Sequence, residues 1–157
     1  MNIHHPFDPI VEKVNKELPL HSMWDGFWIA SWKRKTLIVS ASFDKSLYRD
    51  YDIVFKRVTF FNLPEQWRDT AVRGDDLLRI ASVQEFQSQQ PCFEVGDRTI
   101  FAIDIYLGDV KHTFFIIAKN IYLIKCPPAD RYPIYDYTDP YGEEKDYPSL
   151  KNRVTNF

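Results

Sequence analysis

Residues 24 to 63 read WDGFWIASWKRKTLIVSASFDKSLYRDYDIVFKRVTFFNL, and this stretch decides the fold class. It contains ten aromatic residues, and apolar residues alternate with polar ones along most of it. Alternation with a period of two predicts β-strands that have one buried and one solvated face. The basic turn Lys33-Arg34-Lys35 separates two such runs, 26–33 and 36–43, and this arrangement predicts an antiparallel hairpin.

A third run, residues 51–61, changes phase part-way along. Its apolar residues up to Phe55 lie on one face, and those from Val58 onward lie on the other. An extra residue near Lys56-Arg57, as in a β-bulge, would produce this change. Coverage of both faces is the alternative explanation.

The rest of the chain predicts one helix and further strands. Asp8 and Pro9 are suited to the cap and the first turn of a helix that ends before Pro19. Alternation predicts strands at 77–82 and 99–107, and the apolar run 112–126 is either one bent strand or two strands. The sequence of residues 83–91 fits either a helical turn or a loop. We therefore predict a single α+β domain, mainly β, with a curved antiparallel sheet of about six or seven strands.

Domain organisation follows from a change in composition after Pro127-Pro128. Residues 1–126 are expected to form the sheet domain with its N-terminal helix. Residues 127–157 hold five of the nine tyrosines and lose periodicity, so we expect an irregular tail packed on the same domain. This tail contains six acids and four bases, and it therefore carries the whole net charge of −2.

The overall charge, the N-terminal segment and the length of the apolar runs limit the classes of function. A sequence pI of about 6.1 argues against nucleic-acid binding, since such domains usually carry a basic patch and a high pI. The N-terminal segment lacks a signal-peptide hydrophobic region, and no apolar run is long enough to span a bilayer, so we expect a cytoplasmic protein. Cys92 and Cys126 are expected to be reduced, partly buried thiols.

Recognisable catalytic motifs are missing from the sequence. It contains no HExxH, GxSxG or phosphate-loop pattern, so we expect no enzyme activity, no metal and no cofactor. Cys92 could act as a nucleophile with His112, but we expect a packing role, because buried thiols without a nearby base are inert. Asp50 and Asp52 are expected to be solvated loop charges.

Asp104 is the more unusual carboxylate, because it lies inside an apolar strand between Ile103 and Ile105. It either is half-buried with a partner that tunes its pKa, or it faces water on the polar side of the strand.

Two sets of residues are candidates for binding. Trp28 and Trp32 would share one face of a regular strand and form a flat aromatic platform, although core packing explains them too. Trp24 and Asp25 stand at the start of the same strand. The second set lies in the tail, where tyrosines offer contact area and acids attract a basic partner; it comprises Tyr132, Tyr135, Asp136, Tyr137 and Tyr141. A terminal segment that covers a sheet edge is the alternative for this set.

The succession of a helix, WDG at 24–26, a strand ending in FD, YDIVFKRVTFF at 51–61 and a following LP resembles a known group. It is similar to small uncharacterised bacterial proteins related to the immunity proteins of polymorphic-toxin systems. The resemblance covers about residues 20–82 and implies a cytosolic β-rich protein that binds and neutralises a toxin. It implies no catalytic residues.

Three hypotheses follow. The first is a non-enzymatic domain that binds a protein partner, of which an immunity-type protein is one form. The second is a small-molecule-binding or enzymatic domain with a pocket near Trp28, Trp32 and Asp104. The third is a homo-oligomer that pairs exposed sheet edges.

Overall fold

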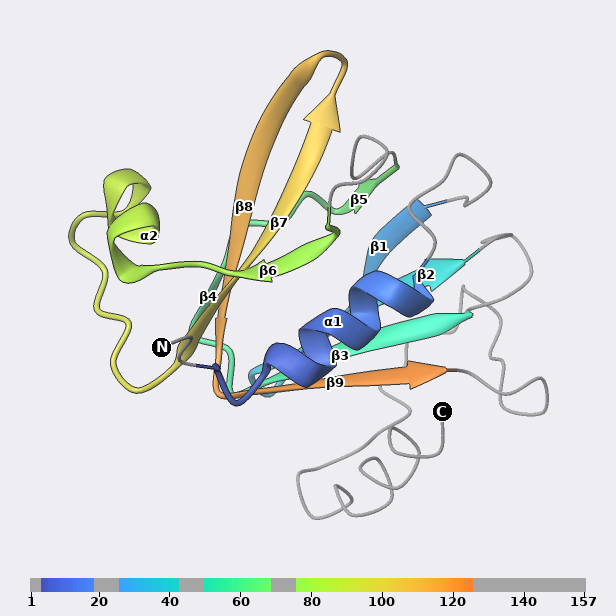
Figure 1. The fold of residues 1–157 in the computed structure, drawn as a ribbon, viewed down its shortest axis with the longest axis horizontal. Helices are drawn as coiled ribbons and strands as arrows, with labels where there is room; N and C mark the ends of the chain where they lie inside the picture. Colours follow the sequence, from blue (N-terminus) through green and yellow to red (C-terminus); the bar gives the residue numbers. More distant parts are fainter. Residues whose placement is uncertain (1–3, 19–25, 43–49, 69–75, 126–157) are drawn as a thin grey trace.

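The protein has two helices and nine strands within the residues that its computed structural model describes, 4–18, 26–42, 50–68 and 76–125 (Figure 1). The helices are α1 (Asp8–Glu17) and α2 (Val83–Gln89). The strands are β1 (Gly26–Lys33), β2 (Thr36–Ser42), β3 (Tyr51–Lys56), β4 (Phe60–Phe61), β5 (Gln66–Trp67), β6 (Leu78–Ile80), β7 (Thr99–Leu107), β8 (Val110–Ala118) and β9 (Asn120–Lys125).

The strands form two antiparallel sheets, so the prediction of a single curved sheet was wrong. One sheet has the order β5-β1-β2-β3-β9, and the other has the order β4-β8-β7-β6. The chain passes from one sheet to the other after β3, β4, β5 and β8. The broader prediction of an α+β fold that is mainly β is confirmed.

The change of phase within residues 51–61 marks one of these passages. β3 ends at Lys56, Arg57 adopts a left-handed backbone with φ 52°, and β4 begins at Phe60 in the other sheet. The side chains change face because the strand changes sheet, and the predicted bulge near Lys56-Arg57 is therefore replaced by a connection.

The main hydrophobic core lies between the inner faces of the two sheets. Alternate residues of the long strands supply it, including Val39, Phe55 and Phe101, all of which are fully buried. α1 packs Val11 and Val14 into the same core. Its Asn15 side chain exchanges two hydrogen bonds with the backbone of Leu78 in β6, at 2.8 and 2.9 Å, and so ties the helix to the second sheet.

α1 begins differently from the sequence expectation. Asp8 is the first helical residue, and Phe7 occupies the cap position without a capping side chain. The Asp8 carboxylate instead accepts a hydrogen bond from the backbone N–H of His5 at 2.7 Å.

Each sheet also buries part of its outer face. On the first sheet this cluster includes Trp28, Ile38 and Val54. On the second sheet, Phe86 of α2 makes edge-to-face contacts at 5.2 to 5.7 Å with three other aromatic rings: Phe60, Phe93 and Phe115. The segment left open between helix and loop is therefore a helix, and its one buried residue fastens it to the sheet.

Three features of the strands agree with the predictions made from the sequence. β1 and β2 form the predicted hairpin, β7 spans the predicted residues, and the run from 112 divides into β8 and β9 at Lys119. The β1–β2 turn places Arg34 and Lys35 at φ 51° and 59°, the geometry that Asn-Gly adopts most readily in such two-residue turns. A left-handed backbone costs a non-glycine residue about 1 kcal/mol. None of the described helices is long and apolar enough to cross a membrane.

Candidate functional site

The β7–β8 hairpin projects beyond the other strands of its sheet (Figure 1). β7 and β8 pair along their whole length. β6 reaches only as far as Ile103 of β7, and β4 pairs only with Ile116 and Ile117 of β8. Among the described strands, therefore, residues 104–107 and 110–113 pair only with each other. At about 3.3 Å per residue, this ribbon extends about 13 Å past the end of β6.

A tight turn ends the hairpin. Leu107 lies opposite Val110, so only Gly108 and Asp109 form the loop. Gly108 has φ 67°, which a type II′ turn requires at its first central position and which glycine adopts without strain.

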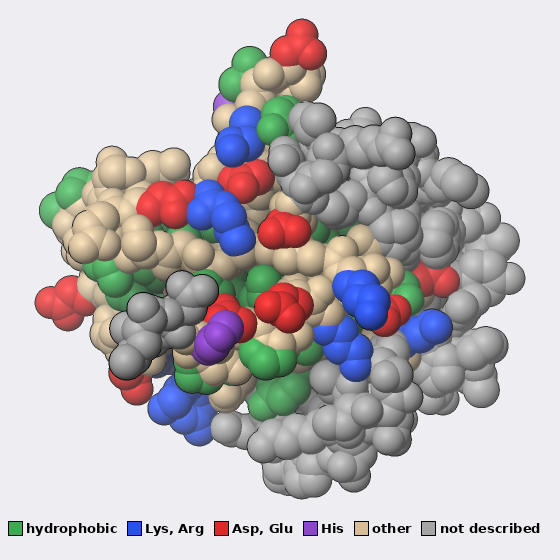
Figure 2. Space-filling view, in the orientation of Figure 1, with side chains coloured by type: hydrophobic (Ala, Val, Ile, Leu, Met, Phe, Trp, Pro, Cys, Tyr) green, Lys and Arg blue, Asp and Glu red, His purple; other side chains and the backbone are tan. Residues whose placement is uncertain are grey.

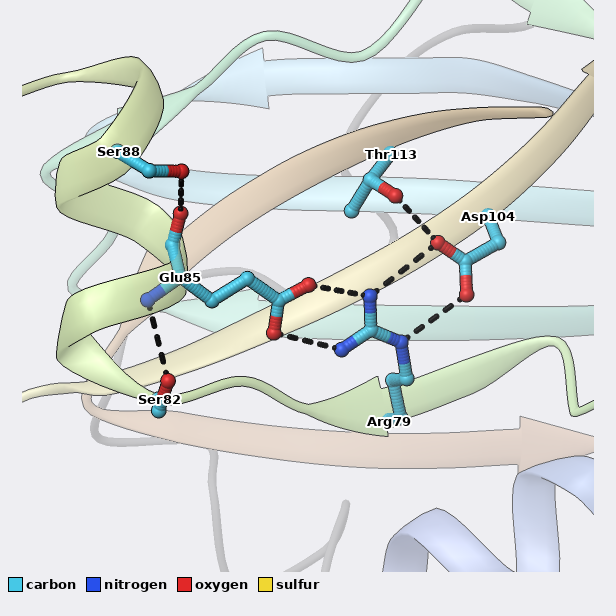
Figure 3. Close-up of polar contacts among 6 residues, drawn as sticks. All are labelled: Arg79, Ser82, Glu85, Ser88, Asp104 and Thr113. Atoms are coloured by element: carbon cyan, nitrogen blue, oxygen red, sulfur yellow. Dashed lines mark hydrogen bonds and ion pairs between the residues drawn. The ribbon is translucent and has the colours of Figure 1, made fainter.

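The guanidinium of Arg79 braces the base of this projection from β6 (Figure 3). It donates two hydrogen bonds to the Glu85 carboxylate of α2, at 2.8 and 2.6 Å. It donates two more to the Asp104 carboxylate of β7, at 3.0 and 3.3 Å. Thr113 of β8 adds a hydroxyl that donates to Asp104 at 2.6 Å, and the Ser82 hydroxyl caps α2 by accepting from the Glu85 N–H at 3.1 Å. Both hairpin strands are thus joined to β6 and α2 at the first residues of the projection.

The network keeps its three central groups ionised. Hydrogen bonds to Glu85 and then to Asp104 raise the pKa of Arg79 above its ordinary value. The hydrogen bond from Arg79 lowers the pKa of Glu85. Burial opposes ionisation of Asp104, but the hydrogen bonds from Arg79 and Thr113 outweigh it and lower the pKa of this carboxyl. Asp104 therefore has a partner, as one of the two sequence interpretations held, and its contacts fix the hairpin.

The tip of the hairpin exposes a pair of large apolar side chains. Leu107 is 55% exposed and Val110 is 58% exposed, and they lie directly opposite each other across the turn. Figure 2 shows that the tip of the projection extends beyond the rest of the described surface, with charged side chains beside its hydrophobic ones. Asp109, Lys111 and His112 are all exposed there.

The predicted Trp28 and Trp32 platform was wrong in its geometry. Ile29 pairs with Val39 and Ser31 pairs with Ile38, so Ala30 is an extra residue that forms a β-bulge. The bulge places the two indoles on opposite faces of β1.

Trp28 belongs to the cluster on the outer face and is 7% exposed, and its indole Nε1–H has no hydrogen-bond partner among the described residues. Trp32 pairs with Leu37 on the inner face, remains 47% exposed, and makes an edge-to-face contact with Phe61 at 5.0 Å. Asp104 lies on the outer face of the other sheet, beside α2, so the structure does not bring it together with these tryptophans.

Asp50 and Asp52 are buried, so the expectation of solvated loop charges was wrong. Asp52 is 0% exposed and accepts a hydrogen bond from the Ser40 hydroxyl at 2.5 Å. Asp50 is 8% exposed and accepts one from the Ser42 hydroxyl at 3.0 Å. These pairs form a polar ladder between β2 and β3 on the outer face of the first sheet.

Other sequence candidates have mixed outcomes. Cys92 is exposed, contrary to the expectation of a partly buried thiol. His112 lies near the hairpin tip, whereas Cys92 lies in the connection from α2 to β7. The remaining candidates lie outside the described residues; they are Trp24, Asp25, Tyr132, Tyr135, Asp136, Tyr137, Tyr141 and Cys126.

The comparisons with known proteins assign no family to the chain. No protein-family model, curated protein or solved structure matches the chain. The similarity to immunity proteins therefore stays a prediction.

Proposed function

We propose that this protein is a non-enzymatic binding protein that uses the tip of its β7–β8 hairpin to hold a protein partner. The observation that carries the proposal is the exposed pair Leu107 and Val110, raised above the surface on a braced two-stranded ribbon. Adjacent exposed apolar side chains, unlike scattered single ones, are typical of protein–protein interaction sites.

The brace makes this tip suitable for binding. A loose loop would lose conformational entropy on association, and rigid presentation reduces that loss. The Arg79 network and the short glycine turn hold the tip in one orientation. Beyond β6 and β4, no other described strand pairs with the two edges of the ribbon, and such edges offer backbone groups to a partner strand.

An immunity-type role is the specific form of this function that the sequence resemblance implies. An immunity protein must occupy its toxin tightly without performing chemistry, and a projecting hairpin can enter a toxin cleft. The alternative of a small-molecule pocket has less support, because the bulge at Ala30 separates the tryptophans that would line it.

The test compares baits that differ only at the tip. We expect a protein from the source cells to be retained by the wild-type chain and lost with the Leu107→Ser, Val110→Thr double variant. Burying the exposed half of each side chain contributes about 1 kcal/mol, so the purified pair should lose about 30-fold in affinity by calorimetry.

The matched control is Val83→Ser, which removes another exposed apolar side chain, 43% exposed, from the start of α2. It should retain the partner unchanged, and all three proteins should have the same melting temperature. Equal affinity of the tip variant and the wild type would refute the proposal, as would the failure of the wild-type bait to retain any specific protein.

A further inference from the structure

Several connections meet at one end of the first sheet, away from the hairpin tip. Hydrogen bonds join them directly: the Val58 N–H donates to the Lys35 carbonyl at 2.9 Å, and the Lys119 N–H donates to the Lys56 carbonyl at 3.0 Å. The segment before β7 joins the same end, where Arg98 Nε donates to the Arg57 carbonyl at 3.2 Å. We name the six basic side chains of these connections the basic end; they are Lys33, Arg34, Lys35, Arg57, Arg98 and Lys119.

The basic end carries a concentrated positive charge. Asp97 lies 3.7 Å from both Arg98 and Lys119 and offsets part of this charge. Neighbouring strands lie about 4.8 Å apart, so turns on adjacent strands fall within about one Debye length at 0.1 M salt. Cations on neighbouring turns therefore act together on an approaching anion, although the whole chain has a net charge of −2.

Backbone strain coincides with these cations. The described non-glycine residues with positive φ are Arg34, Lys35 and Arg57, and all three belong to the basic end. Asn-Gly would relieve the strain in the β1–β2 turn, yet the turn holds Arg-Lys. Strained residues of this kind cluster at functional sites, where the side chain rather than the backbone explains the choice.

An exposed aromatic side chain adjoins the same turn. Trp32 directly precedes Lys33, is 47% exposed, and is held edge-to-face against Phe61 at 5.0 Å. A supported indole beside cations is the combination with which proteins bind single strands, since bases stack on the ring and phosphates pair with the cations.

We propose that the basic end binds single-stranded nucleic acid, with Trp32 stacking a base and the β1–β2 turn holding phosphates. An acidic protein would satisfy the cations, but it would give no particular role to a flat ring beside them. The expectation against nucleic-acid binding rests on total charge, whereas binding depends on local charge. The proposal goes beyond the hairpin function, because the basic end adjoins Thr99 at the opposite end of β7 from Leu107.

The test measures fluorescence anisotropy of a labelled oligothymidylate of about 12 nucleotides, within the usual site size, with the full chain. We expect binding at 50 mM salt that weakens steeply by 200 mM. The Arg34→Asn, Lys35→Gly double variant should weaken binding about tenfold and reduce the salt slope by about 1.4, for two lost phosphate contacts. Trp32→Ala should weaken binding about tenfold through the lost stack.

The turn variant should also melt about 2–4 °C higher than the wild type, because it relieves the strained backbone. This combination of higher stability with weaker binding separates a binding role from a folding role. The matched control is Lys16→Asn with Lys125→Asn, which removes two exposed cations from elsewhere and should change affinity less than about twofold.

Four results would overturn the proposal. They are no binding at 50 mM salt, equal weakening by the control and the turn variant, a lower melting temperature for the turn variant, and binding that Trp32→Ala leaves unchanged. If polyglutamate displaces the oligonucleotide and binding does not depend on Trp32, the basic end docks an acidic protein instead.

Discussion

Arg79→Met removes the guanidinium that joins β6, α2 and β7, while it keeps an apolar side chain of comparable length. The side chains of Arg79 and Glu85 are 34% and 36% exposed, whereas that of Asp104 is only 13% exposed. Exposed ion pairs contribute about 0.2–1 kcal/mol, and breaking a buried pair costs about 3–5 kcal/mol. We place the Glu85 contact near 0.5 kcal/mol and the Asp104 contact near 1.5 kcal/mol, so Arg79→Met should lower the free energy of unfolding by about 2 kcal/mol.

Urea unfolding at pH 7 measures this loss. Arg79→Met, Asp104→Asn and the double variant form a double-mutant cycle, for which we expect a coupling energy of about 1 kcal/mol. A coupling energy near zero, or an Arg79→Met protein as stable as the wild type, would refute the view that this network braces the hairpin.

The pH dependence gives a second check on the same network. The pKa values of Asp104 and Glu85 are lowered in the folded state, so their stabilisation is present above the unfolded pKa values, about 3.9 and 4.3. It is lost as the pH falls through the lower folded values. The stability gap between the wild type and Arg79→Met should therefore shrink below about pH 4. A gap that stays constant from pH 7 to pH 3 would contradict the assignment.

Two further substitutions test the packing that supports the sheets. Gly26→Ala should lower the free energy of unfolding by more than about 2 kcal/mol, because a Cβ there would lie 2.4 Å from the Trp67 carbonyl oxygen and φ is 113°. Phe86→Ala should lower it by about 3–5 kcal/mol and detach α2, since Phe86 is fully buried among three rings. Calorimetric melting checks both values.

Matched controls exist for both changes. Gly96→Ala also has a positive φ, 65°, but its nearest neighbour would be a flexible Arg98 atom at 3.9 Å, so it should cost about 1 kcal/mol. Val83→Ala alters an exposed residue of α2 and should change stability by less than about 0.5 kcal/mol. If either control is as damaging as its partner, the packing explanation fails.

Local patterns in the sequence were sufficient to predict the two hairpins. The alternation at 99–107, the Gly108-Asp109 turn and the basic turn after Lys33 each lie within a short window, so period and turn chemistry predict them directly. The phase change before Val58 was also visible, but periodicity cannot distinguish a bulge in one strand from passage to another sheet.

The features that long-range pairing creates were not predictable in this way. The bulge at Ala30 appears only in the register between β1 and β2, and it alone separates Trp28 from Trp32. Asp52 looks like a surface charge in sequence, and only the pairing of β2 with β3 shows that it is buried beside the Ser40 hydroxyl.

Sequence patterns did not reveal the basic end or the Arg79 network, and the reason is the same for both. The six cations lie at positions from 33 to 119, and the sheet topology alone brings them together. Arg79 contacts residues 6 and 25 positions away, which no spacing rule connects. The sequence did contain a partial indication of the exposed tip, because Leu107 and Val110 flank a glycine turn where polar residues are usual.

The pairing of β3 with β9 bears on how the chain is made. β3 lies beside β2 and β9, and Tyr51 pairs with Lys125, about 70 residues later in the chain. At about 5–20 residues per second, a ribosome needs several seconds to supply that partner. During this interval the nascent chain carries an open strand edge of the kind that chaperones shield. The charges at Asp50, Asp52, Lys56 and Arg57 fit the gatekeeper pattern that limits misassembly of such a strand.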